Sequence, residues 1–180
     1  LAPLPAYSAL AWVALDGVQQ GLDLLARLRE KAGEQLNAFE LVGQEALDLV
    51  LRHIPGARDP FAQPAPWHAL IELSGNDAAL GGQFEQMLAA LLEGGVVRDA
   101  VIAQDVAQAR ALWALRENIS EAQRIEGLSV KHDISVPVSA IPRFIKSAGE
   151  RLLVAFPGIR LVVFGHAGDG NLHYNLSFAD

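Results

Sequence analysis

The sequence predicts an α+β fold in which a mainly antiparallel sheet is covered by helices, and three observations support this prediction. Strand-like and helix-like segments alternate along the 180 residues. No dinucleotide-binding glycine fingerprint follows the first strand candidate, which argues against a doubly wound parallel sheet. The segments group into two strand–helix–strand units that fold back on each other. A duplicated ferredoxin-like arrangement therefore fits the pattern best.

The first half of the chain supplies the clearest elements. Residues 1–6, with Pro3 and Pro5, form a linker-like lead-in. Apolar residues recur at helical spacing after Gly17, and Gly33 ends that helix. The elements expected in this half are strands at 7–15, 36–42 and 67–74, helices at 17–31, 44–53 and 84–92, and an irregular proline-rich stretch at 57–66.

The second half is expected to continue the alternation and to close with a hairpin. Its longest helix has an apolar face that includes Leu112, Leu115 and Ile119. A glycine-rich turn separates the last two strands. The elements expected in this half are strands at 96–103 and 129–138, helices at 105–124 and 138–152, and hairpin strands at 160–164 and 172–178.

The closing hairpin contains two histidines seven residues apart. Because its strands fold back, His166 and His173 can approach each other, while period-two alternation places Asn175 on the face of His173 and turns Tyr174 away. Two imidazoles and an amide suit a divalent metal, an anionic substrate or both. A histidine pair at this spacing is, by itself, more often made of surface or capping residues. A phosphate-binding loop fits less well, because a strand and not a helix follows the glycines.

Two other segments contain residues that could bind an anion. In 129–137, period two places Lys131 on a polar face and His132 on the apolar face, a pattern that is also typical of a half-buried strand with a packed histidine. Arg116 and Ser120 are four residues apart on the expected long helix and would share a face, as they would on an ordinary exposed helix end. Glu40 has no histidine companion in its segment, and we assign it no chemical role.

A resemblance to a known protein family favours a functional role for these residues over a purely structural one. The run Gly165-His166-Ala167-Gly168-Asp169-Gly170-Asn171-Leu172-His173 closely resembles the signature near the C-terminus of the FAD-linked oxidases. This family includes dehydrogenases of D-2-hydroxyacids such as D-2-hydroxyglutarate and D-lactate, and the flavin subunit of glycolate oxidase. The run Leu115-Arg116-Glu117 resembles the family's arginine-bearing helix, and Lys131-His132-Asp133 resembles its Lys-x-Asp strand.

The resemblance implies a role for each candidate residue. It implies that the substrate is held by four side chains, those of Arg116, Ser120, Lys131 and Asn175. It implies that His166 and His173 bind a divalent metal, with zinc, manganese and iron as alternatives. FAD would be bound mainly by an upstream domain, and a Glu-His-Gly segment beyond Asp180 would supply a third metal ligand and the catalytic base. The family also implies helices on one face of the sheet.

Composition excludes several other functions. The absence of cysteine rules out disulfides, iron–sulfur clusters and Cys-ligated zinc. The net charge of -7 argues against nucleic-acid binding and against attraction to anionic lipid. No apolar run reaches the roughly 18 residues of a spanning helix. We therefore expect a cytoplasmic protein, with peripheral attachment of the parent to a membrane left open, and no nucleic-acid partner.

The function expected from these residues is that of a fragment. The chain begins without methionine and stops shortly after a strand, so we read residues 1–180 as the C-terminal substrate and metal domain of an FAD-linked oxidase. The parent would oxidise a small D-2-hydroxyacid to a 2-oxoacid, and the fragment would be inactive alone. The alternative is a non-enzymatic ferredoxin-like domain for ligand binding or oligomerisation. A homodimer and the identity of the electron acceptor are left open.

Overall fold

The computed structural model describes residues 5–178, so the first four residues of the expected lead-in lie outside it. Within this part, eight strands form one sheet, and all neighbouring strands in it are antiparallel. Their order is β4-β1-β3-β2-β7-β8-β5, with β6 also beside β8. The strands are β1 Tyr7–Leu15, β2 Leu36–Gly43, β3 Trp67–Gly75, β4 Asp99–Ile102, β5 Ser129–Val130, β6 Asp133–Ser135, β7 Arg160–His166 and β8 Asn171–Ser177.

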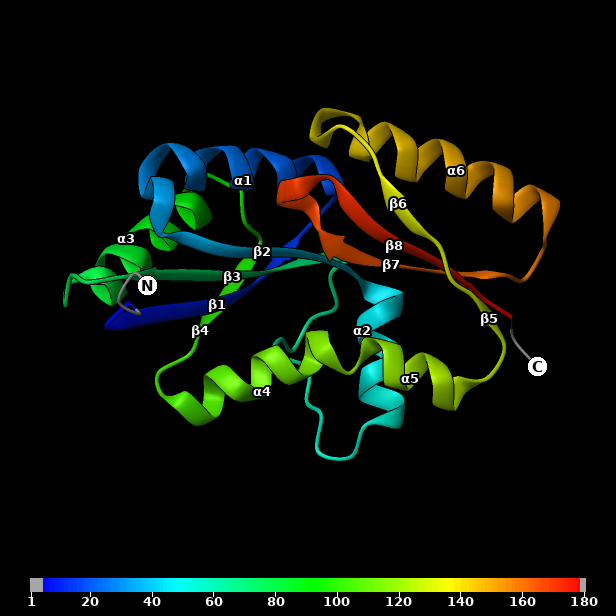
Figure 1. Cartoon of the computed structure of the whole chain (residues 1–180), viewed down its shortest axis with the longest axis horizontal. Helices are drawn as coiled ribbons and strands as arrows, with labels where there is room; N and C mark the ends of the chain where they lie inside the picture. Colours follow the sequence, from blue (N-terminus) through cyan, green and yellow to red (C-terminus); the bar gives the residue numbers. More distant parts are fainter. Residues whose placement is uncertain (1–4, 179–180) are drawn as a thin grey trace.

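The helices connect these strands into two units (Figure 1). In the first unit the order β4-β1-β3-β2, with α1 and α3 as connections, is that of a ferredoxin-like domain into which α2 is inserted. In the second unit, α6 connects β6 to the β7–β8 hairpin, and the two short strands β5 and β6 both pair with β8. The α+β class is thus confirmed, and the second unit is the shorter one. The α-helices are α1 Val18–Ala32, α2 Gln44–His53, α3 Leu80–Glu93, α4 Val106–Glu117, α5 Ile119–Glu126 and α6 Ile141–Ala155.

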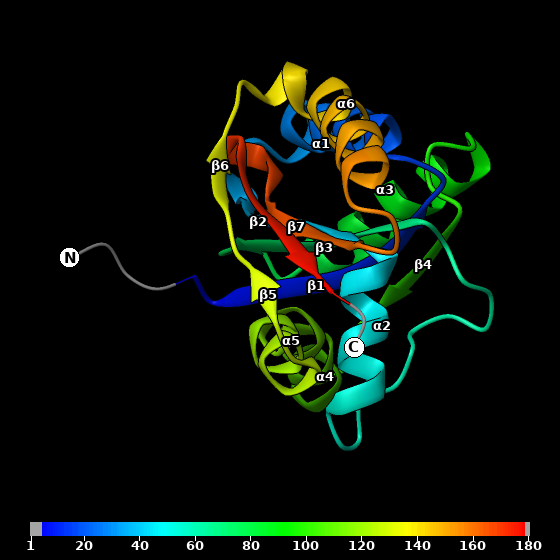
Figure 2. The same ribbon diagram turned by 90° about the vertical axis from the view of Figure 1, so that its right-hand side faces the viewer.

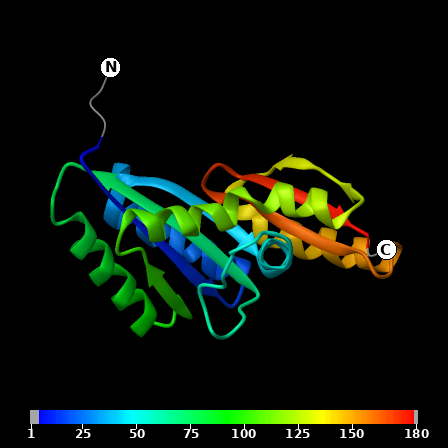
Figure 3. The same ribbon diagram turned by 90° about the horizontal axis from the view of Figure 1, so that it is seen from below.

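Helices cover both faces of the sheet, which corrects the expectation that they cover one. Figures 1 and 2 show α1, α3 and α6 on one face and α2, α4 and α5 on the other. Strand β1 explains why, because its side chains are apolar in both directions: Ala11 and Val13 pack beneath α1 and α3, whereas Trp12 and Ala14 pack towards α2 and α4. From below, α4 and α5 lie one after the other along their face, from the first unit to the second (Figure 3).

Two elements that were predicted as continuous are divided. The expected helix at 105–124 is two helices that meet at Asn118, whose side-chain amide donates to the carbonyl of Ala114 at 2.8 Å. The expected strand at 129–138 is two short strands, β5 and β6. Between them the amide of His132 donates to the Oδ1 atom of Asn175 at 3.0 Å, so a side chain replaces a ladder acceptor. Among residues 5–178, no helix has the length and apolar character needed to cross a membrane.

A half-buried carboxylate links α2, α5 and the hairpin. Glu126 of α5 forms ion pairs with Arg52 and His53 of α2 and with Arg160 of β7. The hydrogen bond from His53, followed by those from the two arginines, lowers the pKa of Glu126 to about 2, against an opposing effect of desolvation. This network fixes α2 and α5 to strand β7 of the second unit.

A buried histidine lies in the first unit, on β3. His68 is 1% exposed, between the rings of Trp12 and Phe61, and its Nε2 atom is 2.7 Å from the Oε1 atom of Gln44. Burial disfavours the imidazolium and lowers the pKa of His68 from 6.5 to about 4, although Asp59 opposes this shift. Folding therefore requires the neutral ring.

We predict that this chain loses stability as the pH falls from 6.5 to 4. Over that range His68 is protonated in the unfolded state but stays neutral in the folded state. The free energy of unfolding therefore falls by on the order of 3 kcal/mol because of His68. Urea unfolding of wild type and His68→Gln at several pH values measures it, since glutamine does not titrate. Identical pH profiles for the two proteins would contradict this assignment.

Candidate functional site

The β7–β8 hairpin has the geometry that the sequence predicts. Phe164 pairs with His173, so His166, two residues further along β7, lies on the same face of the sheet as His173. Tyr174 points the other way, where it packs edge-on against Phe144 of α6. The strands run slightly closer to the turn than expected, and the turn itself is a short 3-10 segment, Ala167–Asp169.

Two glycines make this close-packed turn possible. Gly165 has φ +151°, and a Cβ atom there would lie 2.6 Å from the carbonyl oxygen of Asn171. Gly170 has φ +74°, and a Cβ atom there would lie 2.1 Å from the carbonyl oxygen of Val136. Side chains at these positions would force the hairpin or the segment after β6 to move. The glycines thus fix the backbone that carries the two histidines.

A carboxylate that sequence reasoning left without a role lies beside the first histidine. Glu40 of β2 pairs directly with His166 of β7, and its Oε1 atom contacts the Nδ1 atom of that histidine. Its Oε2 atom accepts a hydrogen bond of 2.7 Å from the Nε atom of Arg116 on α4. Glu40 is 1% exposed, whereas the His166 side chain is 57% exposed. Glu40 therefore has a histidine companion that its own segment lacks, because strand pairing brings distant residues together.

The ring of Phe164 supports the other residues of the cluster. The guanidinium carbon of Arg116 is 4.6 Å from its centroid, and the ring of His173 is 4.7 Å away, centroid to centroid. The Nδ1 atom of His173 is 2.5 Å from the Oδ1 atom of Asp133 on β6. Arg116 and His173 thus pack against Phe164, on the face of the sheet that also carries His166.

The remaining predicted substrate residues are Lys131, Asn175 and Ser120, and each has different surroundings. Lys131 is exposed between β5 and β6, whose shared register places it opposite Asn175. Asn175 is buried, and its Nδ2 atom donates to the Oε1 atom of Gln123 at 2.9 Å. Ser120 is exposed on α5, beyond the break at Asn118, so the helix spacing that linked it to Arg116 does not hold as assumed. Their contact with substrate stays a prediction.

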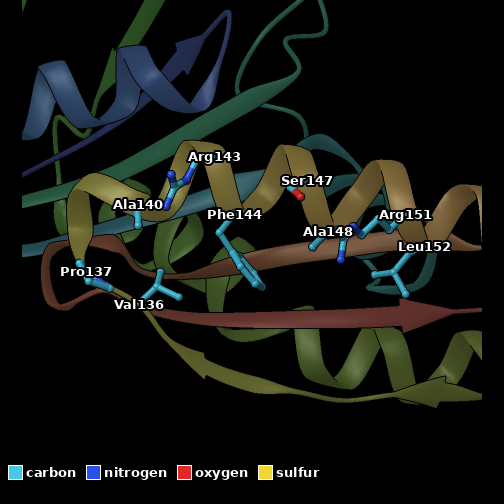
Figure 4. A pocket seen from close by; sticks show the side chains of 9 residues that line it. All are labelled: Val136, Pro137, Ala140, Arg143, Phe144, Ser147, Ala148, Arg151 and Leu152. Atoms are coloured by element: carbon cyan, nitrogen blue, oxygen red, sulfur yellow. The ribbon is translucent and has the colours of Figure 1, made fainter.

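A pocket of about 240 Å³ opens beside His166. Glu40, Trp113 and Arg29 line it, and Arg29 donates to the carbonyl of Gly168 at 2.7 Å. Trp113 therefore faces this pocket in addition to packing against the core. A larger pocket, of about 700 Å³, lies along α6 on the opposite face of the sheet (Figure 4). None of the predicted site residues lines that pocket.

The donor atoms of the cluster fit part of a metal site. Both Nδ1 atoms contact carboxylates, an arrangement that leaves the Nε2 atoms of His166 and His173 to face a ligand. Within residues 5–178, no group of three histidine, cysteine, aspartate or glutamate side chains is placed to hold a metal ion. Catalytic zinc usually has three protein ligands, so these two supply an incomplete set.

Comparison with known proteins decides the family. The family model described as "FAD linked oxidases, C-terminal domain" matches residues 4–180. The chain belongs to this family. The resemblance seen in residues 165–173 is thereby confirmed. In this FAD-linked oxidase domain, the two histidines and Arg116 lie on one face of the sheet.

Relatives and solved structures extend the comparison. A protein of Arabidopsis thaliana named mitochondrial D-2-hydroxyglutarate dehydrogenase is 38% identical over 174 residues, which are 95% of this chain and 30% of that protein. A D-2-hydroxyglutarate dehydrogenase of Xanthomonas citri pv. viticola is 37% identical over 172 residues, 96% of this chain and 35% of that protein. The chain thus spans about a third of these relatives.

The solved structures are similar in fold alone. An alkyldihydroxyacetonephosphate synthase has a TM-score of 0.63 at 10% identity, over 97% of this chain and 37% of that one. A p-cresol methylhydroxylase with bound substrate has a TM-score of 0.64 at 12% identity, over 100% of this chain and 40% of that one. Both likenesses support the α+β arrangement of the FAD-linked oxidase domain.

We predict that Gly170→Ala destabilises the domain by roughly 3 kcal/mol or more, because a left-handed alanine is strained and its Cβ atom collides with the carbonyl of Val136. Gly158→Ala is the matched control, since Gly158 has φ +88° with open space around its Cβ position. That variant should lose only about 1–2 kcal/mol. Urea unfolding compares the two, and equal losses would show that the collision does not govern the turn.

Proposed function

We propose that this chain is the substrate- and metal-binding part of an FAD-dependent dehydrogenase that oxidises a D-2-hydroxyacid to a 2-oxoacid. The observation that carries the proposal is that Arg116 and His173 pack against Phe164, while Glu40 joins Arg116 to His166, beside which a pocket opens. An arginine and a histidine pair on one face suit a substrate that carries a carboxylate next to a hydroxyl. The names of the plant and bacterial relatives support D-2-hydroxyglutarate as the first substrate to test.

The residues of this chain would bind and orient the substrate. Arg116 is held through its Nε atom by Glu40, so its two terminal amino groups can face a substrate carboxylate as a fork. Lys131, exposed between β5 and β6, would neutralise further carboxylate charge. Such fixed positive groups orient the C2–H bond without reorganisation during the reaction.

Two groups from outside this chain complete the proposal. A divalent metal held by His166 and His173 would polarise the substrate hydroxyl as a Lewis acid. Its third ligand and the catalytic base are proposed to come from the parent beyond Asp180. The turn Ala167–Asp169 leads into strand β8 and not into a helix, so it does not fit the pyrophosphate of FAD. FAD, the hydride acceptor, is therefore proposed to be held by an upstream domain.

Assembly and location stay predictions. A cytoplasmic location is part of the proposal, whereas a homodimer of the parent stays open, and the plant relative carries "mitochondrial" in its name. The rival function, a non-enzymatic ligand-binding or oligomerisation domain, makes a different prediction for the histidines. Substrate oxidation would then be absent, or indifferent to their removal.

We predict that His166→Ala in the full-length parent lowers oxidation of D-2-hydroxyglutarate by about a hundredfold or more and reduces bound metal. A dye-coupled assay measures the rate, elemental analysis measures the metal, and the visible flavin spectrum checks that FAD remains bound. Unchanged oxidation would favour the binding-module alternative. The 180-residue chain alone should show no turnover in the same assay.

We predict that Arg116→Lys raises the KM for the hydroxyacid roughly ten- to a hundredfold, because a lysine is a point charge that cannot hold a carboxylate as a fork. Arg110→Lys is the matched control, since Arg110 is an exposed arginine on the same helix α4. Steady-state kinetics of the parent compare the two. An equal KM in both variants would remove Arg116 from the substrate site.

A further inference from the structure

Glu40 is a carboxylate in the middle of the sheet. Strand β2 lies between β3 and β7, and within it Glu40 pairs with Leu70 on one side and with His166 on the other. Its side chain is 1% exposed, on the face that α4 covers. A buried carboxylate is costly unless its oxygens are paired, so the partners of Glu40 indicate what it does.

Each oxygen of Glu40 has a different partner from the candidate site. Oε2 accepts from the Nε atom of Arg116, at 2.7 Å, and Oε1 contacts the Nδ1 atom of His166. One rigid group on a central strand thus holds a helix residue and a hairpin residue. The Nε atom of Arg116 and the Nδ1 atom of His166 both lie nearer to the backbone than the terminal nitrogen atoms of these side chains.

We propose that Glu40 is a positioning residue of this site, which holds His166 by Nδ1 and Arg116 by Nε so that the Nε2 atom and the two terminal amino groups are presented to the ligands. This inference rests on the proposed function for what those ligands are, a metal ion and a carboxylate. Imidazole carries its proton on the nitrogen whose partner accepts it, so Glu40 also selects the ring tautomer of His166.

Asp133 holds the second histidine in the same way but in a different environment. It contacts Nδ1 of His173 at 2.5 Å, and its side chain is 77% exposed. Solvent competes for an exposed carboxylate, so its hold on the ring is weaker than that of the buried Glu40. The asymmetry makes His166 the imidazole whose orientation depends most on a single residue.

The test uses ¹⁵N-histidine NMR of the 180-residue chain at pH 8.5, without metal. In the wild type, His166 should carry its proton on Nδ1. In Glu40→Gln, the single amide oxygen goes to the permanently charged Arg116 and the NH₂ group turns towards His166, so Nδ1 must accept and the proton moves to Nε2. His173 should keep its tautomer in the same spectrum. Titration with Zn²⁺ alone should show a ten- to hundredfold weaker affinity in this variant.

Glu72→Gln, on the neighbouring strand β3 and outside the pocket, is the matched control and should change neither result. A wild-type His166 with its proton on Nε2, or a tautomer that Glu40→Gln leaves unchanged, would overturn the inference. If the variant does not fold, as judged by circular dichroism, the wild-type spectrum still decides. A parent that fails to oxidise hydroxyacids while His166 shows the Glu40-dependent tautomer would refute the proposed function and leave this inference standing.

Discussion

The pairing of β2 with β7 is the constraint on which the candidate site depends. It joins the ferredoxin-like unit to the closing hairpin and sets Glu40 opposite His166. The next two residues of β2, Leu41 and Val42, pack into apolar cores on opposite faces of the sheet. A slip of one residue would therefore move Glu40 into the core beneath α1 and away from Arg116. Hydrophobic burial and charge pairing thus specify the same register, because the carboxylate of Glu40 would have no partner inside either apolar core.

The charges at the site couple the residues proposed to bind substrate with the histidines proposed to bind a metal ion. The buried Glu40, which lines the pocket, pairs with the half-buried Arg116, so their charges largely cancel. Asp133 adds a negative charge that solvent screens, because it is mostly exposed. A 2-hydroxyacid brings at least one further negative charge, which a neutral site would desolvate with little Coulombic compensation. A metal ion on the imidazoles, together with the amine of Lys131, would restore the balance. Substrate binding and metal binding are therefore coupled in the proposed function.

Sequence patterns predict this fold where one periodicity extends over a whole segment, as in β1 and α2, whose bounds agree with expectation. They fail where a side chain competes with the backbone: Asn118 divides a helix and Asn175 divides a strand. Within the site, the hairpin and Arg116 could be found from local motifs. Glu40 could not, because its partners come from β7 and α4, and no local pattern encodes that pairing. The available signal was a lone carboxylate inside the apolar run from Phe39 to Val42.

The motif at residues 165–173 contains glycines that packing requires and histidines that packing does not require. Gly165 and Gly170 are required by packing, since neighbouring carbonyl oxygens occupy the space that a Cβ atom would take. Any chain with this hairpin beside β6 needs them, whatever it catalyses. His166 and His173 belong to the other kind: their side chains are 57% and 33% exposed, so the core does not require them. The buried carboxylate of Glu40 contacts the exposed imidazole of His166, which in our proposal sets the direction in which that imidazole points. The glycines therefore support the fold, whereas the histidines with Glu40 have their role in the proposed function.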